Sequence, residues 1–119
     1  MGWRGLTAAA MTDMPRGRIY RARLAHIGED KFFLVVSNNR RNRAFEQVLA
    51  ARLTTTPPRD ERPAMVPLGP GEIMTGWVSC DDIETLYEDE VRADLGAITA
   101  PAMRRVEAGL RAALGMADS

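Results

Sequence analysis

A lysine and a run of threonines are the residues of this chain whose types and spacing could do chemistry. Lys31, the only lysine, precedes the apolar run 32–37, and Thr54, Thr55 and Thr56 close a second apolar stretch. If the two stretches are neighbouring strands, these ends converge. An ammonium group with nearby hydroxyls suits a phosphodiester whose negative charge grows in the transition state. The bland alternative stays open, because a lone lysine beside a turn is usually solvated and threonines are ordinary strand residues.

The sequence lacks the other common catalytic and metal-binding patterns. Its only histidine, His26, and its only cysteine, Cys80, form no zinc signature and stand in no triad motif. Asp81, Asp82 and Glu84 lie close together, but such acids at a strand end are more often solvated than bound to a cation. The sequence has no glycine-rich phosphate loop of the nucleotide-binding type. We therefore expect no metal and no cofactor.

The charges balance in sum but not along the chain. Residues 1–62 carry eleven Arg and one Lys against six acids, whereas residues 63–119 carry four Arg against ten acids. Such asymmetry can build one basic face for a polyanion. The alternative is that opposite charges interleave in the folded chain and cancel. The preference for arginine over lysine also suits planar, bidentate contacts with phosphate.

Length and composition indicate one globular domain. The 119 residues, 45% of them hydrophobic, can bury a single core without disulfides. One cysteine fits a reducing compartment, and no apolar run approaches the roughly 20 residues of a membrane span. We expect a cytoplasmic protein with a mobile tail over residues 1–15, a domain over 16–115 and a short C-terminal tail over 116–119.

Most of the chain shows the periodicity of β-strands separated by turns. In the stretch 16–24 apolar residues alternate with arginines, which predicts a half-buried strand. The continuous run 32–37 predicts a central strand covered on both faces. Residues 38–43 are expected to form a loop or a single helical turn, and Gly76 to let its strand bend or approach another backbone closely. Further strands are expected at 47–56, at the edge position 64–68, at 73–80, at 81–86 as a short strand or a turn, and at 95–98 after a helical turn.

The C-terminal end of the chain predicts an amphipathic helix of about four turns. Thr99 suits its N-cap, Pro101 its first turn and Gly115 its end. One face of this helix would carry Met103, Val106, Leu110 and Leu114. The whole chain is therefore predicted to be a compact, mostly antiparallel β-domain closed by a C-terminal helix.

Five segments of the chain resemble the MazF (PemK, Kid) toxins of bacterial toxin–antitoxin modules. Two of them are FFLVVSNNRRNRAF and LAARLTTTPP. The others, RGRIYRARL, TGWVSCDDIETL and LGAITAPAMRRVEAGLRAALG, stand in the order that the family shows. The resemblance runs from about Pro15 to Gly115. No single segment is as specific as a zinc signature, but five in order are much stronger than one.

The resemblance implies a fold, an assembly and an activity. The implied fold is mainly β, an SH3-like β-barrel with a C-terminal helix, and the implied assembly is a homodimer. The implied reaction is metal-independent, sequence-specific cleavage of single-stranded RNA. In it the ribose 2′-OH attacks the adjacent phosphate and leaves a 2′,3′-cyclic phosphate and a 5′-OH end. The implied partner is a cognate acidic, MazE-like antitoxin.

Two catalytic positions follow from the resemblance. The family usually places an arginine just before its LVVS-type strand, and Lys31 stands there in this chain. The family's catalytic threonine matches Thr54, with Thr55 as the alternative if the register slips by one. The first loop is shorter than the family's usual one, and a lysine neutralises phosphate without gripping it bidentately. We therefore expect a different division of proton-transfer roles and different base recognition.

Six arginines become candidates for steering and holding the RNA backbone. Arg40 and Arg43 rank first, because they lie between the two strands that carry the catalytic pair. The alternative is that half of the six pair with the acidic C-terminal half of the chain. Trp77 and Phe33 are expected in the core or a dimer interface and not as stacking platforms. The six are Arg21, Arg23, Arg40, Arg41, Arg43 and Arg52.

Two rival functions come from other classes. The first is a gyrase poison of the CcdB type, which shares the fold and carries its gyrase contact in a C-terminal Trp-Gly-Ile. This chain ends Gly-Met-Ala-Asp-Ser, which argues against that function. The second is a non-catalytic RNA-binding barrel, which an RNA cleavage assay would distinguish from an enzyme.

Overall fold

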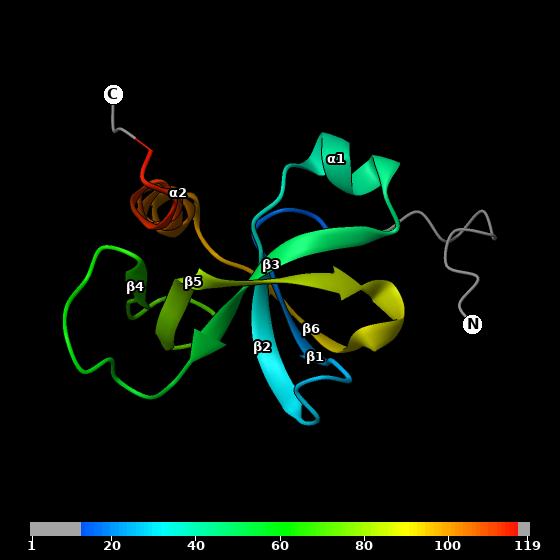
Figure 1. Ribbon diagram of the computed structural model, residues 1–119, viewed down its shortest axis with the longest axis horizontal. Helices are drawn as coiled ribbons and strands as arrows, with labels where there is room; N and C mark the ends of the chain where they lie inside the picture. Colours follow the sequence, from blue (N-terminus) through cyan, green and yellow to red (C-terminus); the bar gives the residue numbers. More distant parts are fainter. Residues whose placement is uncertain (1–12, 117–119) are drawn as a thin grey trace.

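Six antiparallel strands form one sheet in residues 13–116, the part of the chain that the structure, a computed structural model, describes. Their order across the sheet is β4-β5-β3-β2-β1-β6 (Figure 1). The mainly β fold with a C-terminal helix is as predicted. The elements are β1 (Arg18–Arg23), β2 (Asp30–Val35), α1 (Asn39–Ala44), β3 (Gln47–Thr54), β4 (Met65–Leu68), β5 (Gly76–Tyr87), the 3-10 turn η2 (Glu88–Glu90), β6 (Val91–Ala97) and α2 (Ala100–Leu114).

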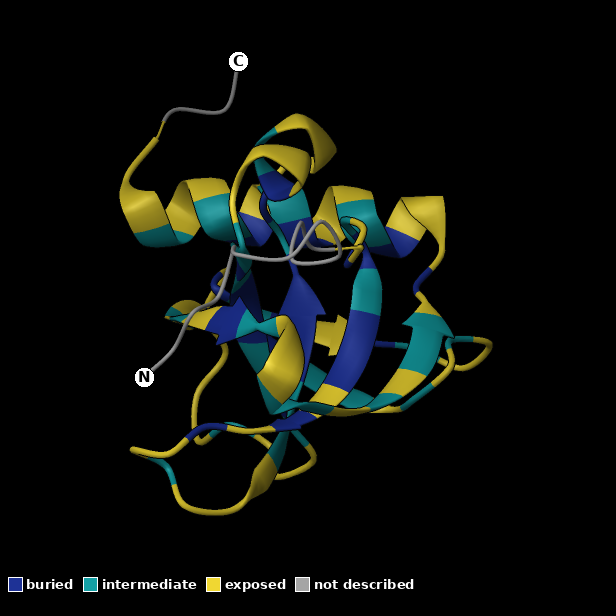
Figure 2. Cartoon of the chain, turned by 90° about the vertical axis from the view of Figure 1, so that its right-hand side faces the viewer, coloured by how far each residue is buried: buried dark blue, intermediate teal, exposed yellow. Residues whose placement is uncertain are grey.

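The sheet buries apolar side chains on both of its faces. One cluster includes Ile19 and Leu34 and packs against α2, and the other includes Tyr20 and Phe33. β2 serves both clusters, since Phe33, Leu34 and Val35 are all 0% exposed. The prediction of a central strand covered on both faces is confirmed. Figure 2 shows the buried residues running along the strands, with the exposed side of α2 turned outward.

β5 is one long strand where the sequence predicted two segments. The expected strand at 73–80 and the short strand or turn at 81–86 are a single element that begins only at Gly76. The adjacent acids Asp81 and Asp82 suggested a break. They interrupt the apolar pattern without ending the strand, because backbone pairing with β3 and β4 continues on either side of them.

A bulge explains why β5 has no uniform alternation. Arg52 of β3 lies opposite Ser79, whereas its neighbour Ala51 lies opposite Ile83. Residues 80–82 are therefore extra on β5 at this point. A bulge bends its strand and changes which face its side chains meet. The first half of β5 accordingly packs into the cluster against α2, and its second half into the other cluster.

Other predicted boundaries moved by a few residues. β1 and β3 are shorter than the predicted 16–24 and 47–56. β6 begins at Val91, earlier than the predicted 95–98. The charged residues of this edge strand hid it, although its backbone pairs with β1 along most of its length. Cross-strand pairing overrides side-chain pattern most easily at a half-exposed edge.

The C-terminal helix begins and ends as predicted. Thr99 caps its first turn through a side-chain hydrogen bond, and Gly115 ends it in the left-handed region, at φ 71°. Val106 is fully buried, as expected for the apolar face. Leu114 was wrongly placed on that face, since it is 69% exposed. The helix therefore contacts the sheet over its first turns and projects beyond it at its end.

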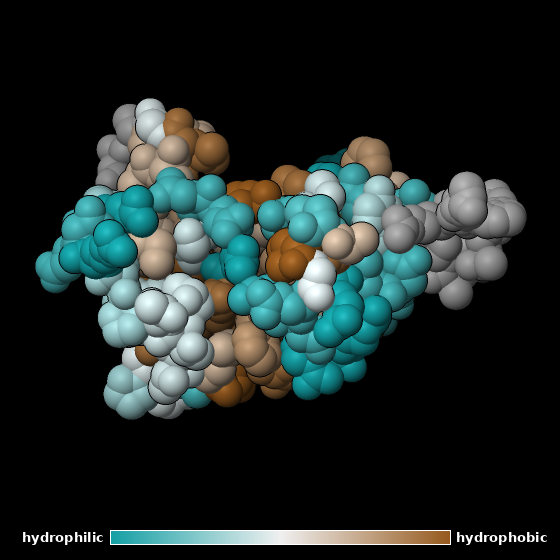
Figure 3. All heavy atoms as spheres, turned by 60° about the horizontal axis from the view of Figure 1, so that its bottom comes forward, coloured by the Kyte–Doolittle hydropathy of each residue, from teal (hydrophilic) through white to brown (hydrophobic). Residues whose placement is uncertain are grey.

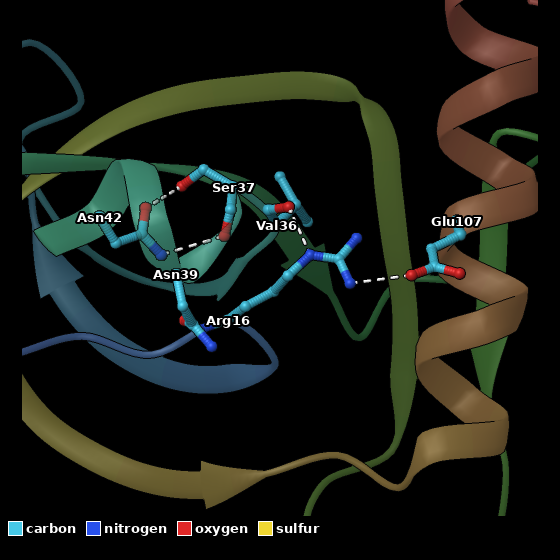
Figure 4. Close-up of polar contacts among 6 residues, drawn as sticks. All are labelled: Arg16, Val36, Ser37, Asn39, Asn42 and Glu107. Carbon is cyan, nitrogen blue, oxygen red and sulfur yellow. Dashed lines mark hydrogen bonds and ion pairs between the residues drawn. The ribbon is translucent and has the colours of Figure 1, made fainter. Parts of the chain in front are cut away.

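Arg16 ties the start of the domain to both helices (Figure 4). Its Nε donates to the backbone oxygen of Val36, and its Nη1 lies 2.8 Å from Glu107 of α2. Its backbone N–H donates to the side chain of Asn39 in α1. One residue thus holds the end of β2, α1 and α2 in register.

The predicted helical turn after β2 is the short helix α1, which a buried side chain anchors. Asn42 is 2% exposed and donates to the backbone oxygens of Ser37 and Met14. Met14 is 3% exposed, so packed chain begins before the predicted boundary between tail and domain. Residues 1–12 and 117–119, which were expected to be tails, lie outside the described residues. Neither helix in the described part has the length and apolar character of a membrane span.

Candidate active site

A cavity of about 380 Å³ opens where β2 begins and β3 ends. Lys31 and the threonines 54–56 line it. Phe32 of β2 lies opposite Leu53 of β3, so the next residues outward, Lys31 and Thr54, meet at adjacent strand ends. The structure therefore brings the predicted catalytic residues together, while their catalytic role stays a prediction. The remaining lining residues are Asp30, Phe32, Arg52, Leu53, Met74 and Asp82.

The cavity combines an apolar part with a charged rim. Phe32, Leu53 and Met74 supply its apolar lining. Figure 3 views the molecule from the end where β2 begins, and it shows apolar side chains gathered between two hydrophilic lobes. Low water content beside a charged group strengthens its interactions with a bound anion. This environment suits electrostatic stabilisation of a phosphate.

Lys31 is held at the mouth of the cavity by a neighbouring carboxylate. Its Nζ lies 3.4 Å from Glu29, the residue two positions earlier. The lysine side chain is 30% exposed and the glutamate 67%. An ammonium group has three donors, so one contact with Glu29 leaves others for a ligand. The pair places a cation and a proton acceptor side by side.

The Thr54 hydroxyl is oriented by its own loop. The backbone N–H of Thr56 donates to Thr54 Oγ1 at 3.1 Å. This contact occupies a lone pair of the oxygen and leaves the hydroxyl proton for another acceptor. Thr55 lines the same cavity and is more exposed. Thr54 is therefore the better-positioned donor of the two, in agreement with the order that the family resemblance gave.

Three of the six candidate arginines lie near the cavity, and each has a carboxylate partner. Arg52 lies 3.7 Å from Asp82. Arg21 and Arg23 lie 3.4 and 2.9 Å from Asp30. The expectation that opposite charges interleave is correct here, although Asp30 comes from the basic half of the chain. The site is basic in excess but largely balanced, so a phosphate must compete with these carboxylates for the guanidinium groups.

The other three arginines belong to α1, at the far end of β2 and β3. Lys31 begins β2 and Thr54 ends β3, whereas α1 joins the opposite ends of these strands. Arg41 is engaged with Gln47 and lies 5.0 Å from the ring centre of Phe45. Arg40 and Arg43 are exposed. Their ranking as the first RNA contacts rested on sequence proximity to the catalytic strands, and the structure does not bring them to the cavity. A role for Arg40, Arg41 and Arg43 in holding RNA stays a prediction.

The remaining chemistry-bearing side chains offer no alternative centre. Burial raises the pKa of the Cys80 thiol to about 11, so it stays protonated at neutral pH. His26 lies 3.0 Å from Glu84 on the surface. Residues 13–116 contain no group of three or more His, Cys, Asp or Glu that could hold a metal ion. Phe33 is a core residue as predicted, and Trp77 is half-buried.

Sequence reasoning missed three residues of this site. Glu29 and Asp30 sat in a stretch interpreted only as a turn, although their adjacency to Lys31 was a usable signal. Met74 had no signal, because the segment before β5 was predicted to be strand. Its position depends on a loop that only the folded chain brings to the cavity.

Comparisons with known proteins agree with this geometry. Residues 15–114 match the PemK-like, MazF-like toxins of type II toxin–antitoxin systems. Endoribonuclease MazF4 of Mycobacterium tuberculosis and endoribonuclease MazF1 of Mycobacterium bovis are each 44% identical over 101 residues, 85% of this chain and 92% of theirs.

Solved structures give the same family. An endoribonuclease from a mycobacterial species, in complex with its cognate antitoxin, has a TM-score of 0.80 and 42% identity over 88% of this chain and 98% of its own. A MazE–MazF structure from Deinococcus radiodurans, with a TM-score of 0.70 and 22% identity over 87% of this chain and 96% of its own, shares the fold. This chain belongs to the PemK-like, MazF-like family of toxins of type II toxin–antitoxin systems.

Proposed function

We propose that this chain is an endoribonuclease toxin that cleaves single-stranded RNA at specific sequences and is neutralised by a cognate antitoxin. The observation that carries the proposal is the convergence of Lys31 and Thr54 on one cavity, in a chain whose named relatives are endoribonucleases. Membership of the MazF-like family favours this function over a CcdB-like gyrase poison and over a non-catalytic RNA-binding barrel.

The reaction proposed for the cavity is an internal transesterification. The ribose 2′-oxygen forms a bond to phosphorus, and the bond from phosphorus to the 5′-oxygen breaks. The products are a 2′,3′-cyclic phosphate and a 5′-OH end. The 2′ proton must leave as the bond forms, and the departing 5′-oxygen must gain one. Neither transfer requires a metal ion, and no metal is proposed.

Three side chains divide the work. The Lys31 ammonium stabilises charge on the non-bridging oxygens and can donate a proton to the leaving 5′-oxygen. The Thr54 hydroxyl, with its oxygen already held by the Thr56 N–H, donates to a non-bridging oxygen. Glu29 is the carboxylate beside Lys31, at 3.4 Å, and is the candidate acceptor of the 2′ proton.

The proposed partners follow from the charge and from the solved relatives. A mycobacterial relative has been solved with its cognate antitoxin. An acidic antitoxin segment would compete with RNA by taking the cations of the cavity from their internal carboxylates. We also propose that the toxin acts in the cytoplasm as a homodimer, which light scattering of the purified protein would test.

The deciding experiment is cleavage of RNA in EDTA. Purified protein is mixed with several unrelated single-stranded transcripts, and the fragments are tested for 5′-OH ends by kinase labelling without prior phosphatase treatment. Direct labelling is expected, at recurrent short sequences. The same transcripts annealed to complementary strands serve as the control and should resist cleavage. Intact transcripts in every single-stranded reaction would refute the enzyme and favour the non-catalytic barrel.

A further inference from the structure

A second cavity, of about 390 Å³, lies beside the proposed active site and has no role in the chemistry above. Trp77 and Met65 line it together with three prolines, 58, 63 and 67. Its charged lining residues are Glu61 and Arg62. Its size falls within the roughly 300–1,000 Å³ of small-molecule sites. We propose that this cavity, the Trp77 pocket, binds an unstacked nucleobase of the RNA substrate, next to the phosphate that is cleaved.

The strand register places the Trp77 pocket directly beside the reacting groups. Trp77 on β5 lies opposite Pro67 on β4 and opposite Thr54 on β3. Residues directly opposite in antiparallel strands share a face, and adjacent strands lie about 4.8 Å apart. Lys31 continues the same row on β2, one residue beyond the last pair of β2 and β3. A nucleotide whose phosphate sits at Lys31 and Thr54 can therefore reach the pocket with a neighbouring base.

The lining of the pocket matches the chemistry of a nucleobase. Tryptophan offers a π-face on which any base can stack, and prolines form rigid apolar walls with no N–H to satisfy. Arg62 lies 3.7 Å from Asp60 and 3.9 Å from Asp81, beyond hydrogen-bond distance in both cases. Its guanidinium is thus free to turn toward a base edge, while Glu61 can accept from an exocyclic amino group.

The charges around the pocket favour a neutral occupant over an acidic peptide. Arg62 is the one cation among the lining residues of this pocket, and it is surrounded by Asp60, Glu61 and Asp81. An acidic antitoxin segment would meet like charge here and cation-bearing surface at the neighbouring cavity. RNA divides in the same way, with its neutral base suited to the Trp77 pocket and its phosphate to Lys31. The inference rests on RNA being the substrate, as proposed above.

Fluorescence of Trp77 tests the pocket without any cleavage. Trp3 is the only other tryptophan, so Trp3→Phe leaves Trp77 as the sole reporter. The probes are single-stranded hexamers of 2′-O-methyl RNA, which cannot react because the 2′-OH is blocked. Saturable quenching of Trp77 is expected. A hexamer that lacks one base, moved along the strand, should lose the quenching at one position only.

Variants then separate stacking from phosphate contacts. Trp77→Ala should weaken binding of the hexamers about tenfold, the scale of one base–aromatic stack, by the same factor at low and high salt. Trp77→Phe should restore most of that loss, which a purely structural defect would not predict. Arg62→Ala, in an exposed loop, should change which base is preferred. Phe45→Ala removes a 53% exposed aromatic ring from α1 and should leave binding unchanged.

The outcomes distinguish failure of the pocket from failure of the enzyme. Quenching by the hexamers in a protein that cleaves no RNA would keep the pocket and refute the endoribonuclease. Cleavage by a protein whose Trp77 emission ignores the hexamers would keep the enzyme and overturn the pocket. Quenching by poly-glutamate but not by RNA would assign the pocket to a protein partner and overturn the proposal. So would an emission change that depends only on protein concentration, since that would indicate a second copy of the chain.

Discussion

Gly76 and Thr54 meet backbone to backbone at the edge of the active-site cavity. A Cβ atom on Gly76 would lie 2.5 Å from the carbonyl oxygen of Thr54 and 3.3 Å from its carbonyl carbon. Gly76 has a φ of 129°, which side-chain-bearing residues rarely adopt. The sequence predicted a glycine that lets a backbone approach closely, and this contact is that approach. The start of β5 therefore fixes the main chain of the proposed catalytic threonine.

Gly76→Ala is expected to damage both stability and cleavage. The substitution forces a methyl group against backbone that cannot swing aside, and it adds strain of about 1–3 kcal/mol from the positive φ alone. Thermal unfolding and RNA cleavage should both report the loss. Gly71→Ala is the matched control, because Gly71 has a φ of 95° and a methyl group there would meet only its own chain neighbours within 4 Å. Equal cleavage by the two variants would show that contact with Thr54 is irrelevant to activity.

The hydroxyl of Thr54 is expected to matter more than its methyl group. Thr54→Ala should lower the cleavage rate about 100-fold, the usual cost of losing one transition-state donor, with little change in stability. Thr54→Ser keeps the hydroxyl and should retain most of the rate. Thr55→Ala is the control and should cleave nearly as fast as the unchanged protein. If Thr55→Ala were the slower variant, the catalytic hydroxyl would belong to Thr55.

Glu29→Gln should separate RNA binding from reaction. Removing the carboxylate releases Lys31 from a partner at 3.4 Å, so the lysine becomes freer to contact phosphate. Binding of an uncleavable 2′-O-methyl RNA should tighten a few-fold at low salt, with the gain fading as salt screens it. The cleavage rate at saturating RNA should fall, because the proposed proton acceptor is lost.

A matched control for Glu29 lies in the same loop region. Asp30→Asn removes the partner of Arg21 and Arg23, and it should also tighten RNA binding. It should not lower the saturated rate, since Asp30 is assigned no proton. A saturated rate that survives Glu29→Gln would remove Glu29 from the chemistry and leave it only a partner of Lys31.

The sequence was most informative where local signals agreed with tertiary packing. The helix α2 was predicted end to end because its cap, its proline and its terminal glycine are local features. Its tightest contact was invisible, since a Cβ on Gly109 would lie 2.6 Å from Val66 and 2.9 Å from Cys80, residues distant in the sequence. β5 was misjudged for the same reason, because its bulge exists only in register with β3.

The candidate site divides along the same line. Lys31 and Thr54 were found because the strands that carry them show clear apolar runs and resemble a known family. The α1 arginines were ranked by closeness in sequence, and the strand direction carries them to the other end of the sheet. Met74 reaches the cavity from a loop with no regular period. Which loops surround a site is a tertiary property that hydrophobic patterning does not encode.

The loop that carries Met74 is held by a carboxylate at the start of α2. Glu72 accepts hydrogen bonds from both the backbone N–H and the hydroxyl of Thr99, at 2.9 and 2.5 Å. These contacts, first the one to the hydroxyl, lower the pKa of Glu72 below its ordinary 4.5. Because the folded chain holds the charged form, Glu72 stabilises the fold above pH 4.5. That contribution is lost as the pH falls through the lowered pKa.

Glu72→Gln should therefore lower the melting temperature at neutral pH and have no such effect in strong acid. The difference at neutral pH is expected to be small, about 0.5 kcal/mol, because the group is screened by solvent at a helix N-terminus. Glu61→Gln, which changes an exposed carboxylate of the preceding loop, is the control and should shift stability little at any pH. A Glu72→Gln deficit that persisted below the lowered pKa would mean that Glu72 acts by shape and not by charge. Since Glu72 also positions Met74, the same variant should raise the RNA concentration needed for half-maximal cleavage while leaving the saturated rate in place.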